Sequence, residues 1–179
     1  LVAVADDGID LRQAGEFLFD ILGSARGLSV GAIAGLSGDN LSGLTTTQMG
    51  QLSTNQIKSL SASGLSSFTT EQVTALSTTQ IRYINGTALK GLTAEQLDAF
   101  DTTTLQALST TQIRSLSATQ ISELNPDDLA SLTTTQLKSL TATEAAALSG
   151  DQVAALDANQ VGSLTTTLIM DLTATAIGG

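Results

Sequence analysis

The chain has 179 residues, contains no Cys, His or Trp, and carries a formal net charge of −10 from seven basic and seventeen acidic residues. This composition excludes disulfides, thiolate chemistry and histidine-based catalysis, and it disfavours nucleic acids and anionic membrane surfaces as partners, because both need clustered Lys or Arg. Because no stretch approaches the roughly 20 apolar residues of a membrane-spanning helix, we also expect no membrane span.

Residues 1–5 read Leu-Val-Ala-Val-Ala, which resembles the end of a secretory signal peptide with a small-residue cleavage site. An arbitrary boundary of the sequence accounts for the same letters equally well. Three acids follow, Asp6, Asp7 and Asp10. They resemble a loose calcium ligand set but lack the spacing and the terminal Glu of an EF-hand, so we predict no metal site.

Residues 1–27 form the first of two expected segments. Between residues 9 and 25, the apolar residues Ile9, Leu11, Phe17, Leu18 and Leu22 recur in a partly helical pattern, and Gly27 is a plausible helix stop. We predict an amphipathic helix here that covers the start of the second segment, since the terminal units of repeat proteins need such caps. Docking of this helix on another subunit is the alternative.

Residues 28–179 form the second segment and divide into nineteen consecutive eight-residue units. From Leu36 onward, position 1 of every unit is large and apolar, position 2 is Ser, Thr, Asn or Asp, and position 6 is apolar. Position 5 is Gln or Glu in eleven units. The unit at 28–35 is a weaker member, with Ser29 and Ile33 in register.

This pattern predicts one very short capped helix in each unit. Positions 1 and 6 would point to opposite faces of a strand, and an unbroken helix would rotate its apolar stripe by about 80° per unit. Position 2 instead suits an N-cap, position 5 completes a capping box, and positions 1 and 6 form a hydrophobic staple. Pro126 follows Asn125 and so falls at N1, which tolerates proline.

The units are too small to fold singly, because ordering eight residues costs more than two buried side chains and one cap return. We therefore predict an all-α solenoid in which neighbouring units stack. Lys58 and Arg82 are 24 residues apart, as are Lys90, Arg114 and Lys138. This spacing suggests three units per superhelical turn, although coincidence among five charges would also explain it.

No residue pattern indicates catalysis or a cofactor, so we predict that the protein is not an enzyme and uses no cofactor. Asp127 and Asp128 follow Pro126 and are interpreted as first-turn acids of a helix in preference to metal ligands. The residues that depart most from the repeat on one stretch are Arg82, Tyr83, Asn85 and Lys90. They are the candidate binding surface for a protein or a glycan.

Units such as Leu44-Thr45-Thr46-Thr47-Gln48-Met49 and Leu132-Thr133-Thr134-Thr135-Gln136-Leu137 resemble octads of long secreted repeat proteins of Gram-negative bacteria, which are described as adhesin-like or haemagglutinin-like. The resemblance covers most of the chain but identifies no functional residue. It implies an extracellular or cell-surface location.

Three functions are compatible with these patterns. The first is a structural extracellular protein, a filament subunit or adhesin stalk that self-associates through the ends of the solenoid, since the repeat continues to Gly179 without a polar cap. The second is a solenoid module that binds a protein or glycan. The third, a minor alternative, is binding to ice or another surface by the Thr residues at positions 3 and 4.

Overall fold

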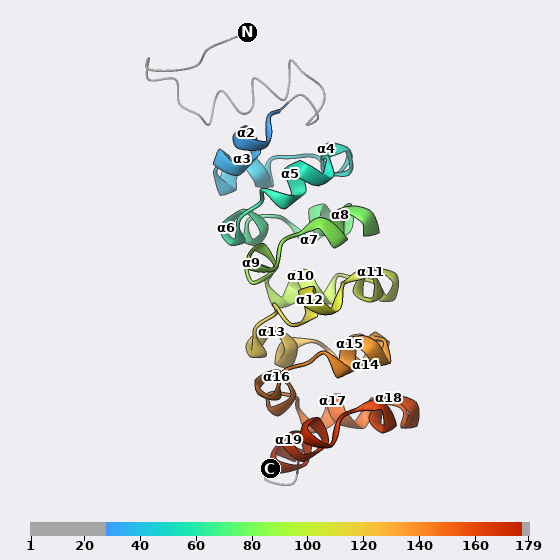
Figure 1. Ribbon diagram of the computed structural model, residues 1–179. Helices are drawn as coiled ribbons and strands as arrows, with labels where there is room; N and C mark the ends of the chain where they lie inside the picture. Colours follow the sequence, from blue (N-terminus) through green and yellow to red (C-terminus); the bar gives the residue numbers. More distant parts are fainter. Residues whose placement is uncertain (1–27, 177–179) are drawn as a thin grey trace.

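A computed structural model describes residues 28–176, with the side chains of 171 and 173–176 left out, and these residues form a rod of short helices (Figure 1). The predicted helix over residues 9–25 lies outside the described residues. Eighteen helices and no strand occur between residues 28 and 176. They are α2 (Val30–Gly35), α3 (Gly38–Ser42), α4 (Thr46–Gln51), α5 (Thr54–Lys58), α6 (Ala62–Ser66), α7 (Thr70–Thr74), α8 (Thr78–Tyr83), α9 (Gly86–Leu89), α10 (Ala94–Asp98), α11 (Thr102–Ala107), α12 (Thr110–Ile113), α13 (Ala118–Glu123), α14 (Pro126–Ser131), α15 (Thr134–Lys138), α16 (Ala142–Ala146), α17 (Gly150–Ala154), α18 (Ala158–Ser163) and α19 (Thr166–Ala176).

Each helix begins where the repeat predicts. In α2 to α18 the side chain at position 2 is the N-cap and accepts a hydrogen bond from the backbone N–H three residues later, as Ser77 does from Gln80 at 3.3 Å. Where position 5 is Gln or Glu, its side chain accepts from the N-cap backbone in return, which completes a capping box. Pro126 lies in the first turn of α14. The predicted one-turn helices and their caps are therefore confirmed.

The last helix differs from the prediction. α19 continues from Thr166 to Ala176 and includes Thr173, which the repeat places at an N-cap. Position 5 is Leu168 in one of these two units and Ala176 in the other, so neither has the Gln or Glu of a capping box. Without that side chain to bond the cap, one longer helix replaces the expected pair.

Three consecutive units make one coil, because each helix packs against the helix three places later along the chain: α2 on α5, α3 on α6, and so on to α16 on α19. This confirms the three-unit turn suggested by the charges 24 residues apart. The helices thus form three stacks, which start at α2, α3 and α4 and are named here the first, second and third stack. In Figure 1 the second stack crosses from the left side at α3 to the right side at α18, so the rod is twisted.

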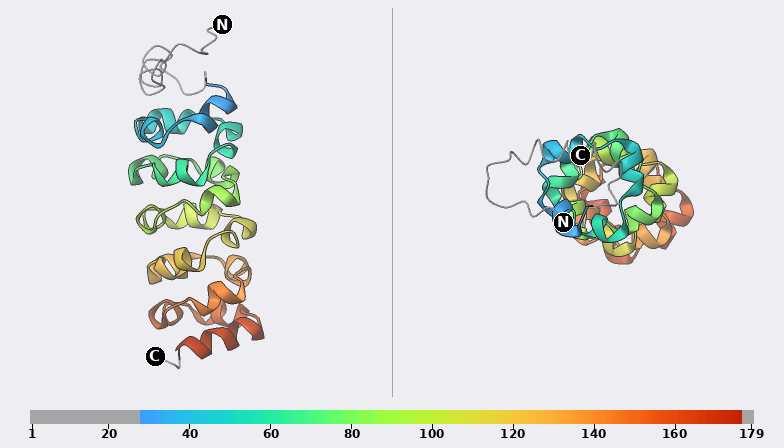
Figure 2. Two further views of the ribbon diagram at one scale, coloured as in Figure 1. Left: turned by 90° about the vertical axis from the view of Figure 1, so that its left-hand side faces the viewer. Right: turned by 90° about the horizontal axis from the view of Figure 1, so that it is seen from above.

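The core is a single apolar column along the axis of the rod, inside the ring of helices that Figure 2 shows from above. Position 1 and position 6 supply it: Leu76 and Ile81, for example, are 4% and 0% exposed. Side chains of this size contribute roughly 1.5–3 kcal/mol each when fully buried. Because every coil needs both neighbours to bury these residues, the stability of the rod comes from stacking.

Candidate functional site

The most regular polar feature is a set of buried glutamine side chains at position 5, here named the glutamine ladder. Each has two roles. Its Oε1 accepts from the N-cap of its own helix, and its Nε2 donates to backbone carbonyls one coil earlier. In Gln80, Oε1 accepts from Ser77 N at 2.8 Å, and Nε2 donates to the carbonyls of Met49 and Leu52 at 2.8 and 2.9 Å.

Nine glutamines donate in this way to the kink of the coil before them, and the side chains of all nine are buried. They are Gln56, Gln72, Gln80, Gln96, Gln112, Gln120, Gln136, Gln152 and Gln160. Carbonyls at the end of a helix have no partner within that helix, and an unpaired buried carbonyl is costly. The ladder therefore satisfies the acceptors that every kink leaves open.

Sequence reasoning assigned position 5 only to the capping box and missed this second role. A box accepts Gln or Glu alike, because both side chains supply an acceptor oxygen. Yet ten of the eleven box residues are Gln, and only Glu144 is a carboxyl. That preference for a side chain with an N–H donor was the available signal.

Two departures from the ladder follow from this geometry. Position 5 of the unit at 84–91 is Ala88, and there Asn85, the N-cap, donates instead to the carbonyls of Lys58 and Leu60, both at 3.0 Å. Glu144 is 3% exposed and accepts from Thr141 N, but a carboxylate has no N–H to give. The carbonyls at its ladder spacing, those of Ile113 and Leu116, receive nothing from it.

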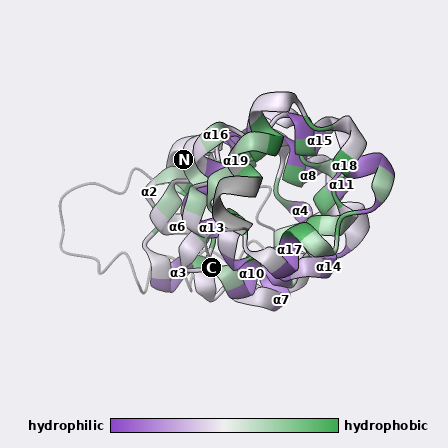
Figure 3. Ribbon diagram, turned by 90° about the horizontal axis from the view of Figure 1, so that it is seen from below, coloured by the Kyte–Doolittle hydropathy of each residue, from purple (hydrophilic) through white to green (hydrophobic). Residues whose placement is uncertain are grey.

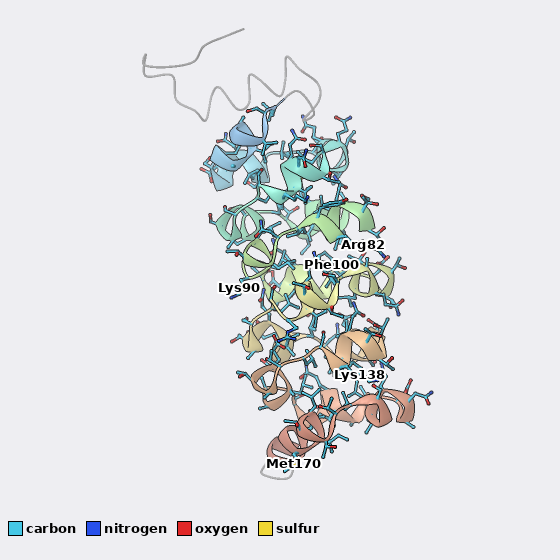
Figure 4. The ribbon with its side chains drawn as sticks, viewed as in Figure 1. Arg82, Lys90, Phe100, Lys138 and Met170 are labelled. Carbon is cyan, nitrogen blue, oxygen red and sulfur yellow. The ribbon has the colours of Figure 1, made fainter. Side chains whose placement is uncertain are left out.

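The candidate binding surface of Arg82, Tyr83, Asn85 and Lys90 is not brought together as one patch. Asn85 is partly buried, and its amide is used within the solenoid. Tyr83 is 40% exposed, but Lys58 Nζ lies 4.8 Å from the centroid of its ring. Figure 4 shows Arg82 and Lys90 pointing outward on opposite sides of the rod. The structure therefore gives this set no common face.

The basic residues at position 7 of the second stack do not form a straight row either. Lys90, Arg114 and Lys138 are exposed and one coil apart. Figure 4 places Lys90 on the left side and Lys138 on the right, because the stack winds around the rod. Sequence spacing alone did not predict this twist.

An acidic cluster lies where α10 meets the start of α14. Asp98 accepts from Asn125 N at 3.3 Å, and Asn125 Nδ2 donates to Asp128. Burial raises the pKa of Asp128 above its usual value, and the charges of Asp98 and Asp127 act in the same direction, against the lowering effect of the Asn125 hydrogen bond. Within the described part of the chain, no group of three or more His, Cys, Asp or Glu side chains is arranged to hold a metal ion.

The end of the rod at α17–α19, seen from below in Figure 3, exposes apolar side chains. Position 6 is at most 2% exposed from Ile33 to Ala145, yet Val161 is 39% and Ile169 is 38% exposed. Met170 of α19, labelled in Figure 4, is 66% exposed. We name these three residues the end patch. Each position-6 side chain needs a following coil to cover it, and none of the described residues follows these.

A family model described as the ALTTAQ repeat matches residues 99–134 and 121–158. Its printed letters fit the octad from position 8 to position 5, as in Ala107-Leu108-Ser109-Thr110-Thr111-Gln112. The match identifies a tandem-repeat protein. No curated protein and no solved structure matches the chain. No helix among the described residues is long and apolar enough to cross a membrane.

Proposed function

We propose that this chain is a structural repeat protein of the cell exterior, in which solenoid ends associate to build a filament or an adhesin stalk. The end patch of Val161, Ile169 and Met170 is the observation that supports the proposal most directly. Inside the rod, side chains at position 6 are covered by the next coil. A second copy that continues the rod would cover the end patch in the same way.

The geometry of the rod supports an open assembly. The end at α17–α19 and the end at α2–α4 present different residues, so a contact between them is heterologous. Because the two ends lie at opposite extremes of the rod (Figure 2), such a contact extends the assembly along its axis and does not close a ring. The net charge of −10 disfavours unspecific lateral aggregation of the copies.

The extracellular location is part of the proposal and is supported by the resemblance of the octads to secreted bacterial repeat proteins. The absence of Cys in the sequence is neutral in this respect. Fractionation of the source cells, with an antibody against the chain, tests it. Recovery of the protein in the cytosol alone would contradict it.

Sedimentation velocity and negative-stain electron microscopy of the full chain over a range of concentrations test the assembly. We expect rods that lengthen with concentration for the unmodified chain and single rods for Val161→Glu/Ile169→Glu, which places two charges in the contact. Thr143→Glu is the matched control, since Thr143 is exposed on the side of α16, and it should assemble normally. A chain that stays monomeric at every concentration would refute end association.

A further inference from the structure

The first coil of the rod is incompletely covered on the side that faces the beginning of the chain. Leu28 and Leu36, at position 1, are partly exposed, whereas Leu44 and Leu52 are 3% and 4% exposed. Val30 in α2 is 44% exposed. Position 1 is therefore buried only where an earlier part of the chain lies against it.

Gln48 shows that a polar partner is missing on the same side. Its Oε1 accepts from Thr45 N at 2.8 Å and from Thr45 Oγ1 at 3.0 Å, as in every capping box. Its Nε2, however, has no acceptor among residues 28–176, and the Gln48 side chain is only partly buried. In the ladder, the corresponding Nε2 atoms point to the preceding coil, 28 and 31 residues back, as from Gln72 to Leu44 and Leu41.

We infer that residues 9–25 of the same chain dock on the first coil, cover Leu28 and Leu36, and supply the backbone carbonyls to which Gln48 Nε2 donates. The ladder spacing from Gln48 falls on Phe17 and Asp20, inside this segment. The segment is rich in the residues needed to cover an apolar face, among them Ile9, Phe17, Leu18 and Leu22.

Attachment favours this occupant over a second copy. Residue 25 is three positions from Leu28, so the segment is held beside the first coil at a high effective concentration. The 24 residues directly before Leu28 also equal the length of one three-unit coil, which is the amount of chain that covers each later coil. A second copy would have to displace this tethered segment.

Gln48→Glu in the full chain tests the assigned donor, because Glu retains the capping-box oxygen, as Glu144 does with Thr141 N, and loses only the N–H group. Hydrogen exchange resolved by segment is the measurement. We expect amides of residues 28–51 to exchange roughly tenfold faster, as expected for one lost hydrogen bond. Gln112→Glu is the matched control and should accelerate exchange of its own and the preceding coil. Unchanged exchange of residues 28–51 in Gln48→Glu would overturn the inference.

Phe17→Asp/Leu18→Asp tests the occupant in the same full chain. This change should accelerate exchange of residues 28–51 and leave residues 84–155 unaffected, and Gln48→Glu should then have no further effect. The Gln112→Glu effect should persist in this background. If the protection of residues 28–51 decreases on dilution of the unmodified chain, a second copy covers the first coil and the inference is wrong. These readouts do not depend on end association, so failure of the proposed function leaves them interpretable.

Discussion

Gln96 Nε2 donates to the carbonyl of Phe68 at 2.6 Å, across 28 residues of sequence and from one coil to the coil before it. The same side chain accepts from Thr93 N through its Oε1 at 2.8 Å. One amide thus caps its own helix and fastens that helix to its neighbour in the stack. Local capping and long-range stacking are coupled by a single residue type, and this coupling can be tested.

Gln96→Glu should lower the free energy of unfolding by about 1–3 kcal/mol at neutral pH, because the carbonyls of Leu65 and Phe68 lose a buried donor while the capping box remains. Urea denaturation measures the change. Gln106→Glu is the control, since Gln106 Nε2 donates to Ser131 O at 3.0 Å at the exposed surface. A change within about 0.5 kcal/mol is expected there. Equal losses in both variants would show that burial of the donor is unimportant.

Glu144→Gln makes the converse change at the one unit whose box contains a carboxyl. The new amide can donate to the carbonyls of Ile113 and Leu116, where Glu144 donates nothing, and it removes a carboxyl that is 3% exposed. We expect a gain of about 1 kcal/mol or more in the free energy of unfolding, measured by urea denaturation near neutral pH. Glu95→Gln, a change of the same kind on an exposed residue of α10, should have little effect. A loss of stability in Glu144→Gln would refute the donor role of the ladder.

Gly91→Ala should destabilise the rod through a clash between backbones. A Cβ built on Gly91 would lie 1.9 Å from the carbonyl oxygen of Ala62, so the second stack must separate at this point. We expect a loss of about 1–3 kcal/mol or more in thermal or urea denaturation. Gly162→Ala is the control: nothing lies within 4 Å of its Cβ, and alanine within α18 should add roughly 0.5–1 kcal/mol.

The acidic cluster predicts opposite pH responses for two aspartates. Burial raises the pKa of Asp128 in the folded chain, so its carboxylate opposes folding above that pKa, and the cost disappears as the pH falls through it towards 3.8. The hydroxyl and the backbone N–H of Thr104 lower the pKa of Asp101, which therefore contributes stability above pH 3.8 that is lost as the pH falls through the lowered value.

Urea midpoints as a function of pH, compared among the unmodified chain, Asp128→Asn and Asp101→Asn, measure these responses. At neutral pH we expect Asp128→Asn to be more stable than the unmodified chain and Asp101→Asn to be less stable. Both differences should shrink in acid. Differences of the same sign at neutral pH would contradict the environments described for the two carboxyls.

The sequence was sufficient to predict the helices, their caps and the stacking, because each depends on contacts within eight residues or on a strict repeat. Ser77, Gln80 and Ile81 indicate a cap, a box and a staple without knowledge of any distant residue. The position of Pro126 and the coil of three units were predicted on the same basis.

Relationships between coils could not be predicted, because they depend on which residues meet across 24 or more positions. The close approach of Gly91 to Ala62, and the replacement of a ladder glutamine by Asn85, become visible only when the register of the stacks is known. The twist that places Arg82 and Lys90 on opposite sides, and so separates the candidate surface, arises from small rotations accumulated over several coils. The continuous α19 results from two successive units without a capping box.

The ladder bond has the same spacing in all three stacks, and this affects how such a chain can vary in length. A whole octad inserted between two ladder units shifts every later helix to the next stack, yet each Gln still finds the carbonyls of the unit three places earlier. Pairs that are unique to one place, such as Gly91 with Ala62 and Asn125 with Asp98, would be parted by an insertion between their members. Gain or loss of octads should therefore be tolerated outside residues 62–91 and 98–125 and selected against within them.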